Sequence, residues 1–118
     1  SLTKADVHLS LSYNKSLQIN GDMAFAECIF IDKLGNCFFN ITESQFKDFI
    51  GNGNFKMRLQ HYLGMSFSRI GKNVTDASAG SEIFTFNRNG YLCLQVNMGN
   101  AKQLFRIKED SKIIIERQ

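Results

Sequence analysis

The chain has 118 residues, of which 43% are hydrophobic and 21% are charged, and its net charge is +3. This length and composition predict one globular domain, and no apolar run is long enough to cross a bilayer. A charge of +3 is too small to indicate nucleic-acid binding by itself, because phosphate recognition needs lysine and arginine gathered on one face. The three cysteines, Cys28, Cys37 and Cys93, each lie in an apolar strand-like run. They are therefore expected to be buried and reduced rather than paired in disulfides.

The first forty residues predict four strands. Apolar residues alternate with polar ones over 7–13, which is typical of a half-buried strand. Leu17 and Ile19 predict a short second strand, and residues 23–32 are apolar on both faces, as a central strand would be. A turn over 33–36 then leads into a strand over 37–41, because glycine and asparagine adopt left-handed conformations cheaply.

A pair of helices is expected next. The string TESQ at 42–45 is a capping box, and it predicts a helix over 43–50. Phe55, Leu59 and Tyr62 then repeat at helical spacing, which predicts a second helix over 54–67.

The remaining chain predicts a polar loop over 68–81 and strands over 82–88, 90–97 and about 103–108. Asn89-Gly90 is the dipeptide that best suits a type I′ hairpin turn. The three isoleucines of 113–115 favour a further strand, and the charged residues of 116–118 are expected to begin a helix. The predicted fold is mainly β, an antiparallel β-sandwich or barrel of about seven strands with an inserted helix-turn-helix.

No catalytic, metal or cofactor site is predicted. The cysteines lack metal-ligand spacing, and neither His8 nor His61 lies beside a serine or cysteine in a nucleophile pattern. Four basic residues near the end of the chain alternate with apolar ones, which favours a solvated strand face and leaves a partner- or phosphate-binding face as the alternative: Lys102, Arg106, Lys108 and Lys112.

Several strings in order along the chain resemble the globular head domain of the XRCC-type, XLF and spindle-assembly-abnormal (SAS) superfamily. These strings are NITESQF, GNFKMRLQHYL, IFTFN and NAKQLFRI, and the likeness runs over about residues 5–115. The resemblance implies a non-enzymatic scaffold head of DNA end-joining repair that occupies residues 1–118. It also implies a coiled coil after Gln118 through which two chains dimerise.

The same resemblance implies a partner-binding surface at Lys56, Lys102 and Phe105. Asn54 and Ala101 stand where such heads carry a basic and a large aromatic contact residue. Partners would be other proteins and further copies of the chain, with DNA contacted only indirectly and no membrane. The location would be intracellular, either nuclear or centrosomal.

Two alternatives remain open at this point. One is a centriolar SAS-type assembly head. The other is an OB-type module for single-stranded nucleic acid, which the run AECIFIDKLGNCFFNITESQFKDFI resembles. Such a module would use exposed aromatic residues among basic ones, and Phe38, Phe39 and Tyr91 are the candidates.

Overall fold

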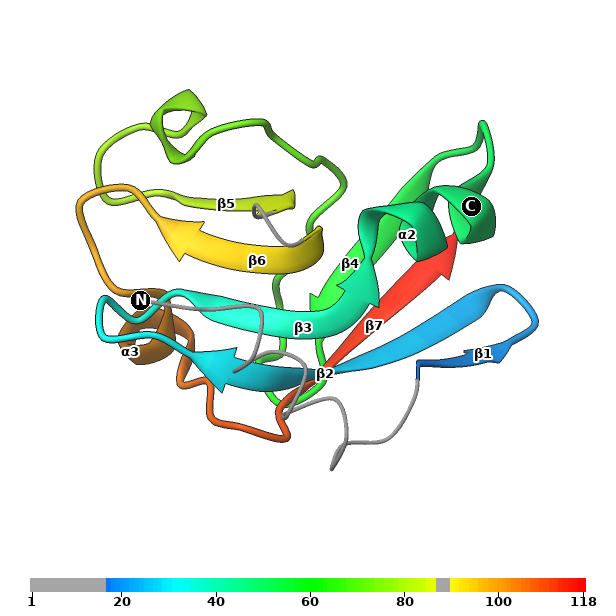
Figure 1. Cartoon of the computed structure of the whole chain (residues 1–118), viewed down its shortest axis with the longest axis horizontal. Coiled ribbons are helices and arrows are strands. Elements are labelled where there is room, and N and C mark those ends of the chain that lie inside the picture. Colours follow the sequence, from blue (N-terminus) through cyan, green and yellow to red (C-terminus); the bar gives the residue numbers. More distant parts are fainter. Residues whose placement is uncertain (1–16, 87–89) are drawn as a thin grey trace.

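The computed structural model describes residues 17–86 and 90–118 of the chain. In these residues a seven-stranded antiparallel sheet curls into a half-barrel, with one short helix at each of two opposite ends (Figure 1). The strand order is β4-β7-β2-β3-β6-β5, and β1 pairs with β2 outside this path. The strands are β1 (Gln18–Asn20), β2 (Met23–Ile31), β3 (Cys37–Thr42), β4 (Phe55–Leu59), β5 (Glu82–Phe86), β6 (Tyr91–Val96) and β7 (Lys112–Arg117). The helices are α2 (Glu43–Ile50) and α3 (Ala101–Phe105), and a 3₁₀ turn covers Val74–Asp76.

Strand β2 joins the two halves of the curled sheet. Its first half pairs with β1 and β7, and its second half pairs with β3. The register against β3 shifts between Cys28 and Phe30, which is the irregularity of a β-bulge and bends the strand. At this bend the Asn40 side chain accepts a hydrogen bond from the Glu27 backbone N–H (2.8 Å), so a buried amide replaces a missing ladder contact.

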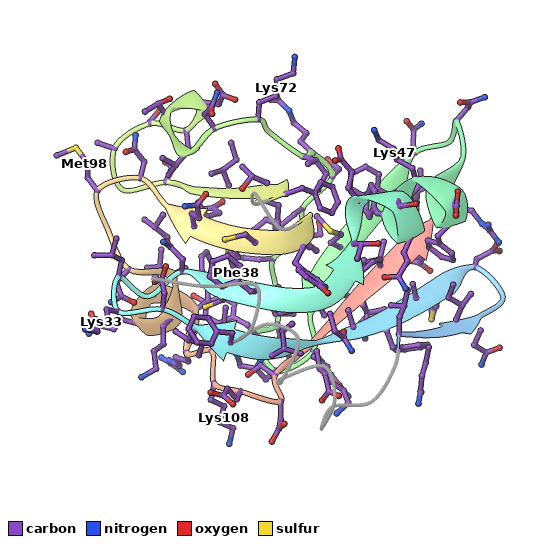
Figure 2. All side chains as sticks on the ribbon, in the orientation of Figure 1. Lys33, Phe38, Lys47, Lys72, Met98 and Lys108 are labelled. Carbon is purple, nitrogen blue, oxygen red and sulfur yellow. The ribbon has the colours of Figure 1, made fainter. Side chains whose placement is uncertain are left out.

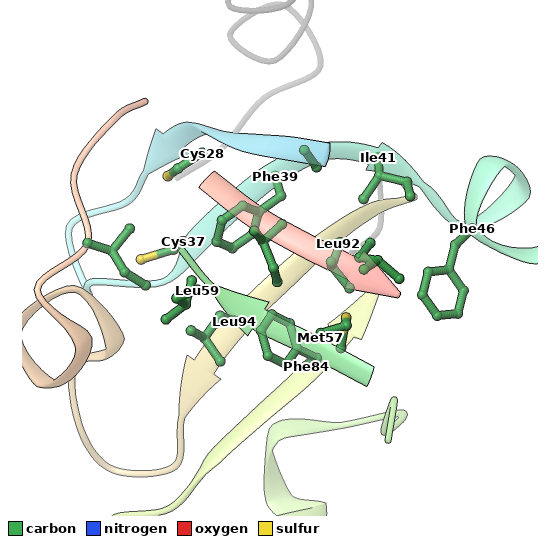
Figure 3. Packing of buried hydrophobic residues seen from close by; sticks show 14 of the residues in the cluster. Cys28, Cys37, Phe39, Ile41, Phe46, Met57, Leu59, Phe84, Leu92 and Leu94 are labelled. Carbon is green, nitrogen blue, oxygen red and sulfur yellow. The ribbon is translucent and has the colours of Figure 1, made fainter. Parts of the chain in front are cut away.

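The core forms from every second residue of the strands. Alternate side chains of β2, β3, β4, β6 and β7 point to the inside of the curl, as the period of two in a strand requires. Phe39, Met57, Phe84, Leu92 and Leu94 are among the fully buried members (Figure 3). Each such side chain contributes about 1.5–3 kcal/mol through burial. The hydrophobic interior of the half-barrel therefore holds the sheet in its curled form.

Both helices begin at the caps that the sequence provides. The Thr42 side chain accepts from the Gln45 backbone N–H (3.1 Å), and the Gln45 side chain accepts from the Thr42 backbone N–H (2.9 Å), so the predicted capping box is confirmed. Helix α2 ends at Gly51, whose φ of +63° favours glycine. The Asn100 side chain caps α3 by accepting from the Gln103 backbone N–H (3.0 Å).

Several expectations about the secondary structure are wrong. Residues 55–59 form strand β4 instead of a second helix, because Phe55, Met57 and Leu59 alternate with charged residues and fill the inner face beside β7. The predicted helix-turn-helix insert is therefore absent from the described residues. The strand expected over 103–108 is wrong as well, because α3 occupies Ala101–Phe105. The prediction of a mainly β, antiparallel fold of about seven strands is confirmed. The strands form one curled sheet, a half-barrel, instead of a two-sheet sandwich or a closed barrel.

The other predicted strands of the described chain are confirmed, including the β5–β6 hairpin. Strand β7 continues to Arg117, so residues 116–118 do not begin a helix. The strand predicted over 7–13 and the residue Asn89 of the hairpin turn lie outside the described residues. None of the helices described is long and apolar enough to span a membrane.

Candidate functional site

Three loops meet beside α3 at one end of the molecule. They are the β2–β3 turn (residues 32–36), the segment 77–81, and the turn 97–100 that follows β6. We call these loops, together with α3, the loop end. The Lys102 backbone N–H donates to the Gly35 carbonyl (3.0 Å), and the Gly80 N–H donates to the Asn97 carbonyl (2.7 Å). These hydrogen bonds make one continuous surface from segments that are far apart in sequence. Figure 2 places Lys33 and Met98 at this end.

The turn 32–36 is held from inside by one carboxylate. Asp32 accepts hydrogen bonds from the backbone N–H groups of Leu34 (3.0 Å) and Asn36 (2.9 Å), and from the Asn36 side-chain amide (3.0 Å). Gly35 has φ +83°, and a β-carbon there would overlap the Asn100 side chain. The turn therefore has a fixed shape that leaves the Leu34 side chain 72% exposed.

The turn 97–100 carries the most exposed of the large apolar side chains described. Met98 is 88% exposed and has φ +57°, a left-handed conformation that is costly for a residue other than glycine. Such backbone strain persists only where the surrounding structure enforces it, and it gathers at functional sites. Leu104 on α3 adds a third apolar side chain, which is 47% exposed.

The loop end combines apolar side chains with amide groups. Leu34 and Met98 are exposed apolar side chains, and Asn36 and Asn100 are amides of the same two turns that each make one hydrogen bond within the protein. Ligand sites use this mixture, with apolar side chains for contact area and a few placed polar groups for orientation. Asp32 accepts three hydrogen bonds within its own turn, so its carboxylate fixes the shape of this part of the loop end.

A hollow lies between residues 66–72 and β5. It encloses about 570 Å³ and is lined by charges of both signs, namely Arg69, Lys72, Asp76 and Glu82. Hydrogen bonds from the backbone N–H groups of Asn73 and Lys72 lower the pKa of Asp76 below its usual value. Two of these side chains are basic and two are acidic, so the charges that line the hollow balance one another.

The three cysteines are buried and form no disulfide, as predicted. A hydrogen bond to Cys28 and burial raise the pKa of the Cys37 thiol, and burial raises the pKa of Cys93. Because the thiolate is the reactive form, Cys37 and Cys93 are unsuited to nucleophilic catalysis.

The structure does not gather the predicted partner-binding residues into one surface. Asn54 and Lys56 are exposed near the start of β4, whereas α3 lies at the opposite end of the sheet (Figure 1). On α3 Lys102 is exposed, but Ala101 and Phe105 are buried in the core. The contact of Asn54, Lys56 and Lys102 with a partner stays a prediction.

Sequence reasoning missed Leu34, Asn36 and Met98. The string DKLGN at 32–36 indicates only a turn when it is taken alone. The signal that it belongs to a site is its contact with residues 97–102, which the pairing of β3 with β6 creates.

Comparison with known proteins identifies a family. The family model of the SAM hydroxide adenosyltransferase C-terminal domain matches residues 26–114. A comparison with the curated proteins finds no match.

Two solved structures share the fold. The crystal structure of an uncharacterized conserved protein from Thermotoga maritima has a TM-score of 0.71 and 23% identity, over 87% of this chain and 39% of that one. That of a conserved hypothetical protein from Thermus thermophilus has a TM-score of 0.60 and 18% identity, over 77% of this chain and 34% of that one. The chain thus spans between a third and two fifths of the length of each.

The family match overturns the resemblance to XRCC-type, XLF and SAS heads, and with it the predicted function. The predictions of a non-enzymatic repair scaffold, a centriolar head and an oligonucleotide-binding barrel are wrong, because the matched family is a domain of an enzyme. The expected coiled coil after Gln118 rested on that resemblance alone. The chain belongs to the family of SAM hydroxide adenosyltransferase C-terminal domains.

Proposed function

We propose that this chain is part of an enzyme that transfers the adenosyl group of S-adenosylmethionine (SAM) to hydroxide, and that the loop end binds the adenosyl group. The observation that carries the proposal is the family match, because residues 26–114 include the β2–β3 turn, the segment 77–81, the turn 97–100 and α3. In this reaction hydroxide attacks the 5′ carbon of the adenosyl group and forms a C–O bond. The C–S bond breaks, and its electron pair moves to the sulfonium sulfur. The products are adenosine and methionine.

The chemistry of the loop end suits the adenine ring. A purine has two apolar faces and an edge of hydrogen-bonding nitrogens. Leu34 and the Met98 thioether provide apolar contact for a ring face, and sulfur–aromatic contacts are favourable. We assign the polar edge to the Asn36 and Asn100 amides, which belong to the same two turns.

The domain's role in catalysis follows from the charges of the reactants. Hydroxide and a sulfonium cation neutralise each other as the bond forms, so a site that excludes water favours the reaction. Apolar side chains that cover the adenosyl group contribute to this exclusion. The solved relatives are more than twice as long as the part that resembles this chain, and we assign the activation of hydroxide to the remainder of the enzyme.

The test is to incubate the full-length protein with SAM and to measure the release of adenosine and methionine. Met98→Ala is expected to lower kcat/KM about tenfold, the factor that corresponds to about 1.4 kcal/mol of lost contact. Leu63→Ala is the matched control, because Leu63 is similarly exposed (84%) and lies outside the loop end. Equal activity in wild type, M98A and L63A would contradict the placement of the site. A wild-type protein that releases neither product would contradict the proposed reaction.

A further inference from the structure

A long connection closes the open side of the half-barrel. Residues 66–81, which we call the strap, run from the side of β4 to the side of β5. Phe67 exchanges two backbone hydrogen bonds with Met57 of β4 (2.7 and 2.8 Å), and the Gly71 N–H donates to the Phe84 carbonyl of β5 (2.8 Å). The strap is therefore attached to both edge strands by backbone groups.

Asn97 attaches the last part of the strap. Its side-chain amide donates to the Ala77 carbonyl (2.7 Å), its backbone N–H donates to the Ser81 carbonyl (3.0 Å), and its carbonyl accepts from the Gly80 N–H (2.7 Å). Two of these bonds are available to any residue. The bond to Ala77 requires a side-chain donor of this length, which asparagine has and aspartate lacks.

Asn97 also begins the turn that presents Met98. It directly precedes that residue, and the Gly99 N–H closes the turn on the Val96 carbonyl (3.1 Å). The left-handed conformation of Met98 costs free energy, so the turn needs support from neighbouring structure. The strap provides this support through its hydrogen bonds to Asn97.

We infer that Asn97 is a positioning residue, which holds the Met98 turn in its binding conformation by fixing the turn to the strap. The inference rests on the proposed function, because it concerns the same ligand. A bond between Asn97 and Ala77 couples two segments, so a ligand held by the Met98 turn also restrains residues 77–81. If the bond is removed, the turn populates other conformations. The apparent affinity for the ligand then falls in proportion to the fraction of molecules whose turn keeps the binding conformation.

The test uses the full-length protein and two substitutions of this residue. Asn97→Asp keeps the size of the side chain but cannot donate to Ala77, and Asn97→Ala removes the side chain. Asn52→Ala is the control, because Asn52 is an exposed asparagine in the α2–β4 turn, away from the strap. For N97D and N97A we expect KM for SAM to rise about tenfold with kcat within about twofold of wild type, as loss of preorganisation predicts. N52A is expected to keep both constants.

Hydrogen exchange separates positioning from a general loss of stability. Adenosine is expected to slow exchange of the Gly80 amide in the wild type and to slow it much less in N97D. If Gly80 exchanges faster in N97D while KM for SAM is unchanged, Asn97 is only a structural tie and the inference is overturned, although the proposed function stands. If the wild-type protein neither binds adenosine nor cleaves SAM, both the proposed function and the inference fail.

Discussion

Replacement of Phe105 by alanine tests whether this side chain belongs to the core or to a surface. Phe105 is 1% exposed, and its ring centroid lies 5.4 Å from that of Tyr62 and 6.0 Å from that of Phe67. Removing a buried phenylalanine ring costs about 3–5 kcal/mol, which is a large share of the roughly 5–15 kcal/mol that stabilises a domain. With a urea m-value of about 1.5 kcal/mol per molar, the unfolding midpoint should fall by about 2–3 M.

The neighbouring residue supplies the control for this experiment. Leu104 is on the same helix but is 47% exposed, so Leu104→Ala should change the free energy of unfolding by less than about 1 kcal/mol. The assay is urea denaturation followed by circular dichroism, with F105A, L104A and wild type measured together. Equal midpoints for F105A and L104A would refute the burial of Phe105. That outcome would instead support a surface role for this side chain.

Substitutions at three further residues test other contacts. Arg117 donates to the Phe49 carbonyl (2.8 Å) and forms an ion pair with Asp22 (3.2 Å), so R117A should lower the free energy of unfolding by about 1–2 kcal/mol. R117K should recover less than half of this loss, because an ammonium lacks the planar fork; full recovery in urea titrations would contradict this account. G35A should cost more than about 1 kcal/mol, because φ is +83° at Gly35, and an unchanged melting temperature would count against the turn described. The pKa of Asp76 is lower in the folded protein than its usual value of 3.8, so the ionised carboxylate stabilises the fold above about pH 3.8. This stabilisation is lost as the pH falls through the pKa of the folded protein. Wild type should therefore be more stable than D76A at pH 7, and the difference in melting temperature should disappear below about pH 4, near the unperturbed carboxyl pKa. A difference that persists in thermal unfolding at low pH would show that the ionised Asp76 carboxylate is not its cause.

Local signals in the sequence predict much of the sheet and one helix. The capping box at Thr42 needs only residues within one turn, and the β5–β6 hairpin needs only a glycine turn between apolar strands. Strand β4 is hard to predict because its string FKMRL fits both the spacing of a helix and the alternation of a strand. Phe55 and Leu59 match helical spacing, and only the pairing with β7 shows that they share a strand face with Met57.

The candidate site is harder to predict than the fold. DKLGN and NMGNA are each recognisable as turns, but sixty residues separate them in the sequence. Their contact depends on β3 lying beside β6, which brings the loop after β2 to the loop after β6. The exposure of Leu34 and Met98 is likewise a property of the assembled loops, and hydrophobic composition alone would place both side chains inside.

The position of β7 in the sheet determines when the domain can finish folding. β7 lies between β2 and β4, and its register joins Met23 to Glu116 across almost the whole chain. While the chain is being synthesised, β2, β3, β5 and β6 can pair as soon as they emerge. β4 has no β7 beside it until residues 112–117 have followed. The nascent chain therefore exposes the apolar faces of β2 and β4 until residues 112–117 have been synthesised, which is the period in which such a chain aggregates most easily and depends most on chaperones.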